Sequence, residues 1–346
     1  MFTDRWRGRN HACISFGLPT GDTCPVGGGH ATNPPVMSAP SHAMPLYFHA
    51  LYTDGIAPEA RFPRERYRRI AERLTDQGDR IAICESPAAT DDEIAIAHDP
   101  AYVTRFLRGE MEESERRRIG LRPWTDLLIP RTRHLIGGAI AALTDVLEEG
   151  GIAANMAGGT HHAHFDWGAG YCVFNDLAIC ARLAVERHGV KRVAIVDLDV
   201  HQGDGTATIL AKDPQIFTLS VHCAHNFPMT KSTSDLDVAL PIDTEDDVYL
   251  EAVTSALDMV WRTEPELVLF QAGVDPLKAD RLGRLAISRD GLRRRNQLVF
   301  DAVVAREVPC VVFMGGGYCK PIEPTIDAFV DLFIQAAEAH ASVRAS

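Results

Sequence analysis

Two short segments of the chain combine the residue types that a metal-dependent hydrolase needs. The first is a glycine-bordered loop with two adjacent histidines, Gly158-Gly159-Thr160-His161-His162. The second is an apolar run that ends in three carboxylates and an imidazole, Asp197-Leu198-Asp199-Val200-His201-Gln202-Gly203-Asp204. Carboxylate and imidazole groups bind divalent cations, and further carboxylates can orient the imidazoles. The two segments therefore predict metal-assisted hydrolysis.

Three side chains have the spacing expected of metal ligands. Asp199 and His201 are two residues apart in a segment that we expect to be extended, so both side chains leave the same side of the backbone. Asp275 follows a second apolar run, in Gln271-Ala272-Gly273-Val274-Asp275. Together the three predict one zinc site with an open coordination position. The alternative is that Asp199 and Asp275 cap the helices that follow them.

Asp197 interrupts an apolar run and is therefore expected to be buried. An unpaired buried charge is costly, so this carboxylate needs a partner. His161 and His162 are candidates, with Asp204 as a second orienting carboxylate. A histidine held by a carboxylate has a fixed tautomer and raised basicity, as a general base requires. The alternative is that the two histidines are ordinary surface residues.

Aromatic residues accompany both groups. Tyr318 follows three glycines and either aims its hydroxyl at a developing oxyanion or packs in the core. Tyr171 and Phe227 are either core residues or the walls of a narrow tunnel around an aliphatic chain. Gly168 and Gly170, which flank this region, allow close approach of the backbone to a ligand.

Short apolar runs alternate with helical patterns along most of the chain. The expected strands are residues 81–84, 192–198, 215–221, 267–272 and 309–314, and the expected helices are 133–149, 176–188, 248–263, 290–306 and 325–339. This alternation predicts an α/β fold: a single domain over residues 44–346, with a central, mostly parallel sheet and helices on both faces. Ligands bind outside the carboxyl ends of such strands, so the chemistry should gather at one edge.

The composition sets broad limits on location and partners. A net charge of −12 argues against nucleic acid as a direct partner and mildly favours cationic substrates. No apolar run is long enough to span a bilayer, the first residues lack a secretory signal, and the eight cysteines stand singly, so we expect a cytoplasmic, reducing location. Residues 1–43 are rich in Gly, Pro, Ser and Thr, which predicts a disordered or loosely attached extension.

From about Leu46 onward, these motifs resemble the histone deacetylase superfamily, which has an arginase-like fold. The tandem histidines, D-x-D-x-H-x-G-D-G-T, A-G-x-D and G-G-G-Y occur in the family's order and spacing. Residues 61–67, 170–176 and 226–228 are similar to a class IV-like bacterial branch. The resemblance implies a zinc enzyme that removes acetyl or longer fatty acyl groups from the ε-amino group of lysine in proteins, or from a related amine.

The resemblance also implies a role for each matching residue. Asp199, His201 and Asp275 would bind zinc. His162 would pair with Asp204 as the main general base, and His161 with Asp197 as an electrostatic or acid partner. Tyr318 would donate to the substrate carbonyl, while the tunnel would be lined by Gly170, Tyr171 and Phe227. A potassium ion would be bound by Asp197, Ser220, the carbonyl of Val221 and the backbone of Asp199 and His201.

The chain also departs from the family pattern. Gln202 replaces a second histidine that is frequent in eukaryotic members, Pro276-Leu277-Lys278 replaces a polar run, and no acidic residue that would hold the substrate backbone at the rim is recognisable. Three other readings remain open: an acetylpolyamine amidohydrolase, a binuclear manganese ureohydrolase and an acyl-lysine-binding scaffold without catalysis. The preferred length of the acyl chain and the oligomeric state are also left open.

Overall fold

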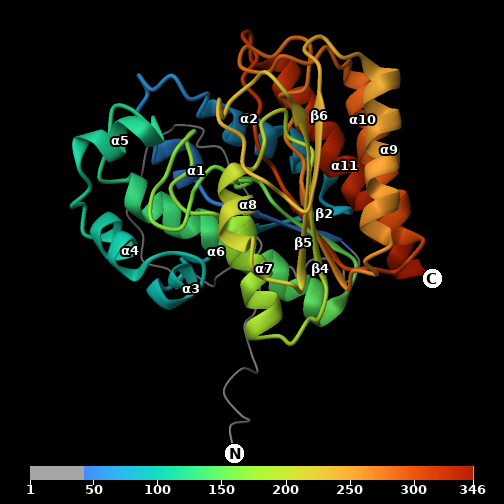
Figure 1. Ribbon diagram of the computed structural model, residues 1–346, viewed down its shortest axis with the longest axis horizontal. Coiled ribbons are helices and arrows are strands. Elements are labelled where there is room, and N and C mark those ends of the chain that lie inside the picture. The colour runs from blue at the N-terminus through green and yellow to red at the C-terminus, as the bar shows by residue number, and fades with distance from the viewer. Residues whose placement is uncertain (1–42, 346) are drawn as a thin grey trace, which may run out of the picture.

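The computed structural model describes residues 43–345, which form one parallel sheet covered by helices on both faces (Figure 1). The sheet order is β2-β1-β3-β8-β7-β4-β5-β6, and every pairing within it is parallel. The strands are β1 Met44–Phe48, β2 Ile81–Glu85, β3 Ile152–Asn155, β4 Val193–Asp197, β5 Ile216–Cys223, β6 Leu236–Leu240, β7 Leu267–Gln271 and β8 Cys310–Phe313. The predicted α/β class is confirmed.

The helices form two layers around this sheet. They are α1 Leu51–Asp54, α2 Glu65–Leu74, α3 Asp91–Ala95, α4 Pro100–Leu107, α5 Glu113–Ile119, α6 Leu128–Glu149, α7 Asp176–Glu186, α8 Asp204–Leu210, α9 Asp246–Trp261, α10 Arg289–Val304 and α11 Glu323–Ala345. In Figure 1, α9, α10 and α11 lie on one side of the strands, and α6, α7 and α8 lie on the other. None of the described helices is both long and apolar enough to cross a membrane.

The register of the central strands brings their carboxyl ends level with one another. Asp197, at the end of β4, pairs with Ser220 of β5 and with Gln271 of β7. Gln271 pairs in turn with Phe313, the last residue of β8. The loops that follow β4, β7 and β8 therefore start side by side, at the edge where ligands bind in sheets of this type.

The sequence predicted most of the central strands but missed several elements. The strands β1, β3 and β6 were not predicted. Helix α6 begins at Leu128 rather than at Arg133, because Pro130 lies in its first turn, where a missing N–H costs no hydrogen bond. The helix ends before Gly150, as expected, and this glycine adopts a φ of 73°. Of the predicted N-terminal extension, residues 1–42 lie outside the described residues.

A buried arginine on α10 braces the carboxyl ends of two central strands. The guanidinium of Arg295 donates to the carbonyl oxygens of Leu198, Ala272 and Gly273 at 3.3, 3.2 and 2.6 Å. Arg295 is fully buried and lies over the ring of Phe270. Because these carbonyls belong to the loops that follow β4 and β7, the arginine fixes the backbone just before the predicted metal ligands.

We predict that Arg295→Met lowers the free energy of unfolding by about 3 kcal/mol or more, because it leaves buried carbonyls without donors. Urea-induced unfolding measures this loss. Arg293→Met, an exposed position on the same helix, is the matched control and should change stability by less than about 0.5 kcal/mol. Equal stability of the two variants would contradict the bracing role.

Candidate active site

Two loops at the carboxyl edge of the sheet, one after β4 and one after β7, bring the predicted metal ligands together. Asp199, His201 and Asp275 are buried, and each offers one ligand atom within 4.8 Å of the others. His201 Nδ1 lies 3.0 Å from Asp199 Oδ1 and 3.1 Å from Asp275 Oδ2. Asp275 Oδ2 has no hydrogen-bond partner among the described residues. Two carboxylates and an imidazole that converge in this way form a donor set suited to zinc.

Electrostatics supports the same interpretation. Burial and the adjacent charge of Asp199 raise the pKa of Asp275 above its usual range. The two carboxylates repel each other in a site from which water is largely excluded, and within residues 43–345 His201 is the one imidazole within 4.0 Å of both. A divalent cation between the three side chains would remove this repulsion and provide Asp275 Oδ2 with a partner.

Two glycines leave the space that the carboxylates of Asp199 and Asp275 occupy. A Cβ atom on Gly316 would lie 1.9 Å from Asp275 Oδ2, and one on Gly273 would lie 2.2 Å from Asp199 Oδ2. The amide of Gly316 also donates to Asp199 Oδ2 at 2.8 Å. Any side chain at these two positions would therefore displace the carboxylates.

Asp199 and His201 were predicted to converge because an extended segment would place both side chains on one side of the backbone, but the structure brings them together differently. Strand β4 ends at Asp197, so Asp199 and His201 belong to a loop and not to an extended strand. Asp199 Oδ1 accepts from the backbone N–H of His201 at 3.0 Å, and this local bond folds the loop. The capping alternative is wrong, because α8 has Gly203 at its N-cap and α10 has Ser288.

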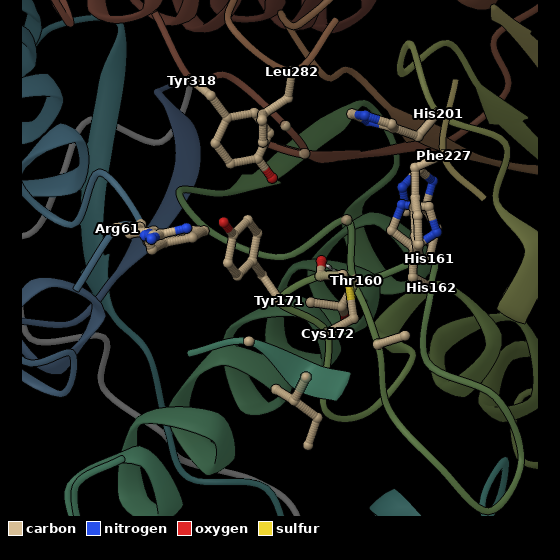
Figure 2. Close-up of a pocket in the computed structure, with 18 of the residues that line it drawn as sticks. Arg61, Thr160, His161, His162, Tyr171, Cys172, His201, Phe227, Leu282 and Tyr318 are labelled. Carbon is tan, nitrogen blue, oxygen red and sulfur yellow. Dashed lines mark hydrogen bonds between the residues drawn. The ribbon is translucent and has the colours of Figure 1, made fainter. Parts of the chain in front are cut away.

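Both predicted pairs of histidine and carboxylate are formed. His161 Nδ1 lies 2.7 Å from Asp197 Oδ2, and His162 Nδ1 lies 2.6 Å from Asp204 Oδ1. A carboxylate accepts only, so Nδ1 carries the hydrogen in each ring and Nε2 is left free to face the cavity. In Figure 2 the imidazoles of His161, His162 and His201 lie together on one side of the pocket.

The two histidines of the tandem pair differ in basicity. Burial and the nearby positive charge of His161 lower the pKa of His162 to about 3, although Asp204 opposes this change. Burial also acts to lower the pKa of His161, but the charges of Asp197 and Asp199 outweigh it and raise this pKa to about 9. At neutral pH His162 is therefore the unprotonated ring of the two, but burial lowers its basicity, whereas the sequence predicted that its carboxylate would raise it.

A buried carboxylate at the start of α7 holds the histidine loop. Asp176 accepts hydrogen bonds from the N–H of Gly159 at 2.9 Å and from the N–H and hydroxyl of Thr160 at 2.8 and 2.7 Å. The preceding residue, Asn175, caps α7 and donates to the carbonyl of Ala163 at 3.1 Å. The start of α7 thus fixes the loop on both sides of His161 and His162.

Tyr318 points into the pocket from the side opposite the histidines (Figure 2). Its N–H donates to Asp280 Oδ2 at 2.5 Å. Arg66, which is buried on α2, donates to the carbonyls of Gly315 and Gly317 at 3.2 and 3.1 Å. Sequence reasoning missed Arg66, although an arginine on the buried face of an amphipathic helix is a recognisable signal.

One cavity of about 930 Å³ connects these groups with the surface. Phe227 lies 4.7 Å from the ring of His162, and Tyr171 lies 5.8 Å from the ring of Tyr318, measured between centroids. A Cβ atom on Gly170 would lie 2.6 Å from His162 Cδ2. The three residues predicted to line a tunnel therefore all border this cavity, and Gly170 allows the close packing of the wall.

Comparison with known proteins agrees with this geometry. The sequence model of the histone deacetylase domain matches residues 60–330, which is more than half of the chain. The chain belongs to the histone deacetylase family. An uncharacterized protein of Picosynechococcus sp. is 41% identical over 287 residues, 82% of this chain and 94% of that protein.

Relatives with functional names are more distant. The histone deacetylase-like amidohydrolase of Pseudomonas aeruginosa is 28% identical over 75% of this chain and 73% of its own length. Histone deacetylase 2 of Arabidopsis thaliana is 36% identical over 54% of this chain, and the match spans 49% of the plant protein. The resemblance to the deacetylase family that the motifs predicted is thereby confirmed.

A third histidine extends the site beyond the family motifs quoted above. His164 Nε2 donates to Asp204 Oδ2 at 3.1 Å, so Asp204 holds both His162 and His164. The Nδ1 atom of His164 lies 2.8 Å from the hydroxyl of Thr208, and its ring stacks on Trp167 at 3.8 Å. Sequence reasoning missed His164; its spacing of two from His162 was the available signal.

We predict that Asp199→Asn and Asp275→Asn each reduce bound zinc from one ion per chain to almost none. The amide keeps the shape of the carboxylate but loses the charge that binds the cation. Plasma mass spectrometry of protein reconstituted with zinc and then desalted measures this occupancy. Asp258→Asn, which is exposed on α9, should bind zinc normally. Full occupancy in either of the first two variants would exclude that residue as a ligand.

We further predict that His164→Leu lowers kcat for amide hydrolysis roughly tenfold and leaves KM unchanged, because Asp204 loses one of its two anchors. His164→Gln, whose amide can still donate to Asp204, should recover most of this loss. The exposed His188 provides the control variant His188→Gln. If the leucine and glutamine variants were equally impaired, His164 would be only a packing residue.

Proposed function

We propose that this chain is a zinc-dependent amidohydrolase that removes acyl groups, acetyl or longer, from the ε-amino group of lysine in proteins or from a related amine. The observation that carries the proposal is a convergence in one cavity. A three-residue metal-binding group, two histidine–carboxylate pairs and a tyrosine all line or adjoin it. The presence of all these groups also favours a catalytic function over an acyl-lysine-binding scaffold, because a scaffold needs none of them.

The residues divide the reaction between them. Asp199, His201 and Asp275 would hold the zinc, which when bound polarises an amide carbonyl and lowers the pKa of water to about 7. His162, oriented by Asp204, accepts the proton of the attacking water through its free Nε2.

Two further groups complete the reaction. Tyr318 donates its hydroxyl to the oxygen on which negative charge develops. His161, held by Asp197, gives a proton to the leaving amine. Each of these steps uses a side chain that borders the cavity.

We also propose a potassium site behind the catalytic centre. Asp197 and Ser220 are paired residues on β4 and β5, so their side chains leave the sheet on the same face. The carbonyl of Val221 and the backbone of Asp199 and His201 complete the expected oxygen donors. The cation would share the charge of Asp197 with His161.

The charge of the cavity favours acylated lysine over an acetylated polyamine. Five arginines line it, against two acidic residues: Arg61, Arg66, Arg118, Arg122 and Arg131, against Glu59 and Asp199. A polyamine carries several positive charges, which these arginines would repel. The net charge of −12 suggested a mild preference for cations, but the lining that a substrate meets has the opposite sign.

The direct test compares an Nε-acetyl-lysine peptide with N-acetylspermidine under the same conditions. We expect the peptide to have the larger kcat/KM. A larger kcat/KM for acetylspermidine would establish the polyamine function instead. A peptide series from acetyl-lysine to myristoyl-lysine, in the same assay, then gives the preferred length of the acyl chain.

We predict that Tyr318→Phe lowers kcat by about 10²–10³-fold with little change in KM, because the variant keeps the ring and deletes one oxyanion donor. Steady-state kinetics on the preferred acyl-lysine peptide measures this. The control is Tyr47→Phe, since the hydroxyl of Tyr47 contacts Asp145 outside the cavity. A wild-type rate in Tyr318→Phe would remove Tyr318 from the mechanism.

A further inference from the structure

Four exposed arginines lie at or beside the mouth of the cavity. Arg61, Arg118 and Arg122 are exposed residues that line it, and Arg281 is exposed next to Leu282, which also lines it. The one acidic residue among the exposed lining residues is Glu59. The mouth is therefore positive on a chain whose overall charge is −12.

Two of these four arginines already have partners. Arg122 forms an ion pair with Glu113 at 3.2 Å, and the guanidinium of Arg118 lies 4.8 Å from the ring centroid of Trp167. For Arg61 and Arg281, no carboxylate of residues 43–345 lies within 4.0 Å of the guanidinium. Within the described part of the chain, no carboxylate occupies these two cations.

The positive charges of Arg61 and Arg281 both affect Tyr171, a residue of the tunnel wall. Burial raises the pKa of Tyr171, and the positive charges of Arg61 and Arg281 both oppose this rise. Figure 2 shows Arg61 on the side of Tyr171 that faces away from the three catalytic histidines, with the hydroxyl of Tyr171 directed to that side. Arg61 and Leu282 both line the cavity, so Arg281, the residue before Leu282, comes from a loop that borders the same tunnel as Arg61, although the two segments are far apart in the sequence.

The loop that carries Arg281 is fixed to the tunnel wall. Asn226 Nδ2 donates to the carbonyl of Leu282 at 2.9 Å, and Arg284 Nη1 donates to the carbonyl of His225 at 3.1 Å. Phe227, which belongs to the tunnel wall, directly follows Asn226. The backbone under Arg281 is thus held in place, and a ligand would need to order only the side chain.

We propose that Arg61 and Arg281 form a subsite for a carboxylate of the substrate and thereby select acylated lysines with a carboxylate nearby. This inference rests on the proposed function. When the acylated nitrogen reaches the histidines, the methylenes of lysine fill the tunnel, and groups on and beside its Cα remain at the mouth. A carboxylate there meets guanidinium groups, whose planar donors suit it. It comes from an acidic neighbouring residue or from the lysine α-carboxylate.

The test compares acetyl-lysine peptides that differ only in their two flanking residues, Glu or Lys. We expect kcat/KM to be roughly tenfold higher for the Glu peptide, through KM and with similar kcat, and the difference to shrink in high salt. Arg61→Gln and Arg281→Gln should each reduce the preference by about two- to fivefold, and the double variant should abolish it. Arg262→Gln, exposed on the far helix layer after α9, is the control.

Calorimetric binding of the same peptides separates this inference from the proposed function. If no peptide is hydrolysed but the Glu peptide binds more tightly, the subsite stands and the catalytic proposal fails. Equal affinities, or a preference that survives in the double variant, would overturn the subsite whatever the activity. Free Nε-acetyl-lysine and its α-amide, compared in the same way, show whether the α-carboxylate or a neighbouring acid is the group bound.

Discussion

The balance of buried charge at the carboxyl edge of the sheet is the constraint on which the site depends. Four buried carboxylates meet there, from Asp197, Asp199, Asp204 and Asp275. Asp197 has His161 as its imidazole partner and Asp204 has both His162 and His164, whereas Asp199 and Asp275 share His201. Buried charges are stable only when compensated, so this shared imidazole leaves an excess of negative charge. A divalent cation is the group that would balance it.

The fold makes this arrangement possible by fixing the backbone around the carboxylates. The parallel register sets the ends of β4, β7 and β8 level, and two buried arginines hold the loops that follow them. Arg295 binds carbonyls after β4 and β7, and Arg66 binds carbonyls in the loop after β8. Both arginines use backbone acceptors, so neither neutralises a carboxylate of the site. The two arginines therefore fix the backbone, and the carboxylates of the site remain available to bind a cation or an imidazole.

Part of this organisation is visible in the sequence. The runs that became β4, β7 and β8 are almost entirely apolar, as strands buried on both faces must be, and the loops that follow β4 and β7 carry the metal-binding group. Strand β3, Ile-Ala-Ala-Asn, is too short and too rich in alanine to stand out, and β6, Leu-Asp-Val-Ala-Leu, is a short edge strand interrupted by the charged Asp237.

Contacts between residues that lie far apart in the sequence could not be predicted from it. His164 binds Asp204 across 40 residues, and Arg61 lines the same cavity as Leu282, the residue that follows Arg281. Such contacts depend on how loops pack, and no local period or spacing encodes them. The same limit explains why the overall acidity gave the wrong sign for the cavity.

Anomalous X-ray diffraction above and below the zinc absorption edge, on crystals of the zinc-loaded protein, locates the bound metal. We expect one strong peak, about 2.0–2.2 Å from a carboxylate oxygen of Asp199 and of Asp275 and from Nδ1 of His201, with a coordination position open to the cavity. A peak at other residues, two peaks within this site, or no peak at these three ligands would contradict this expectation.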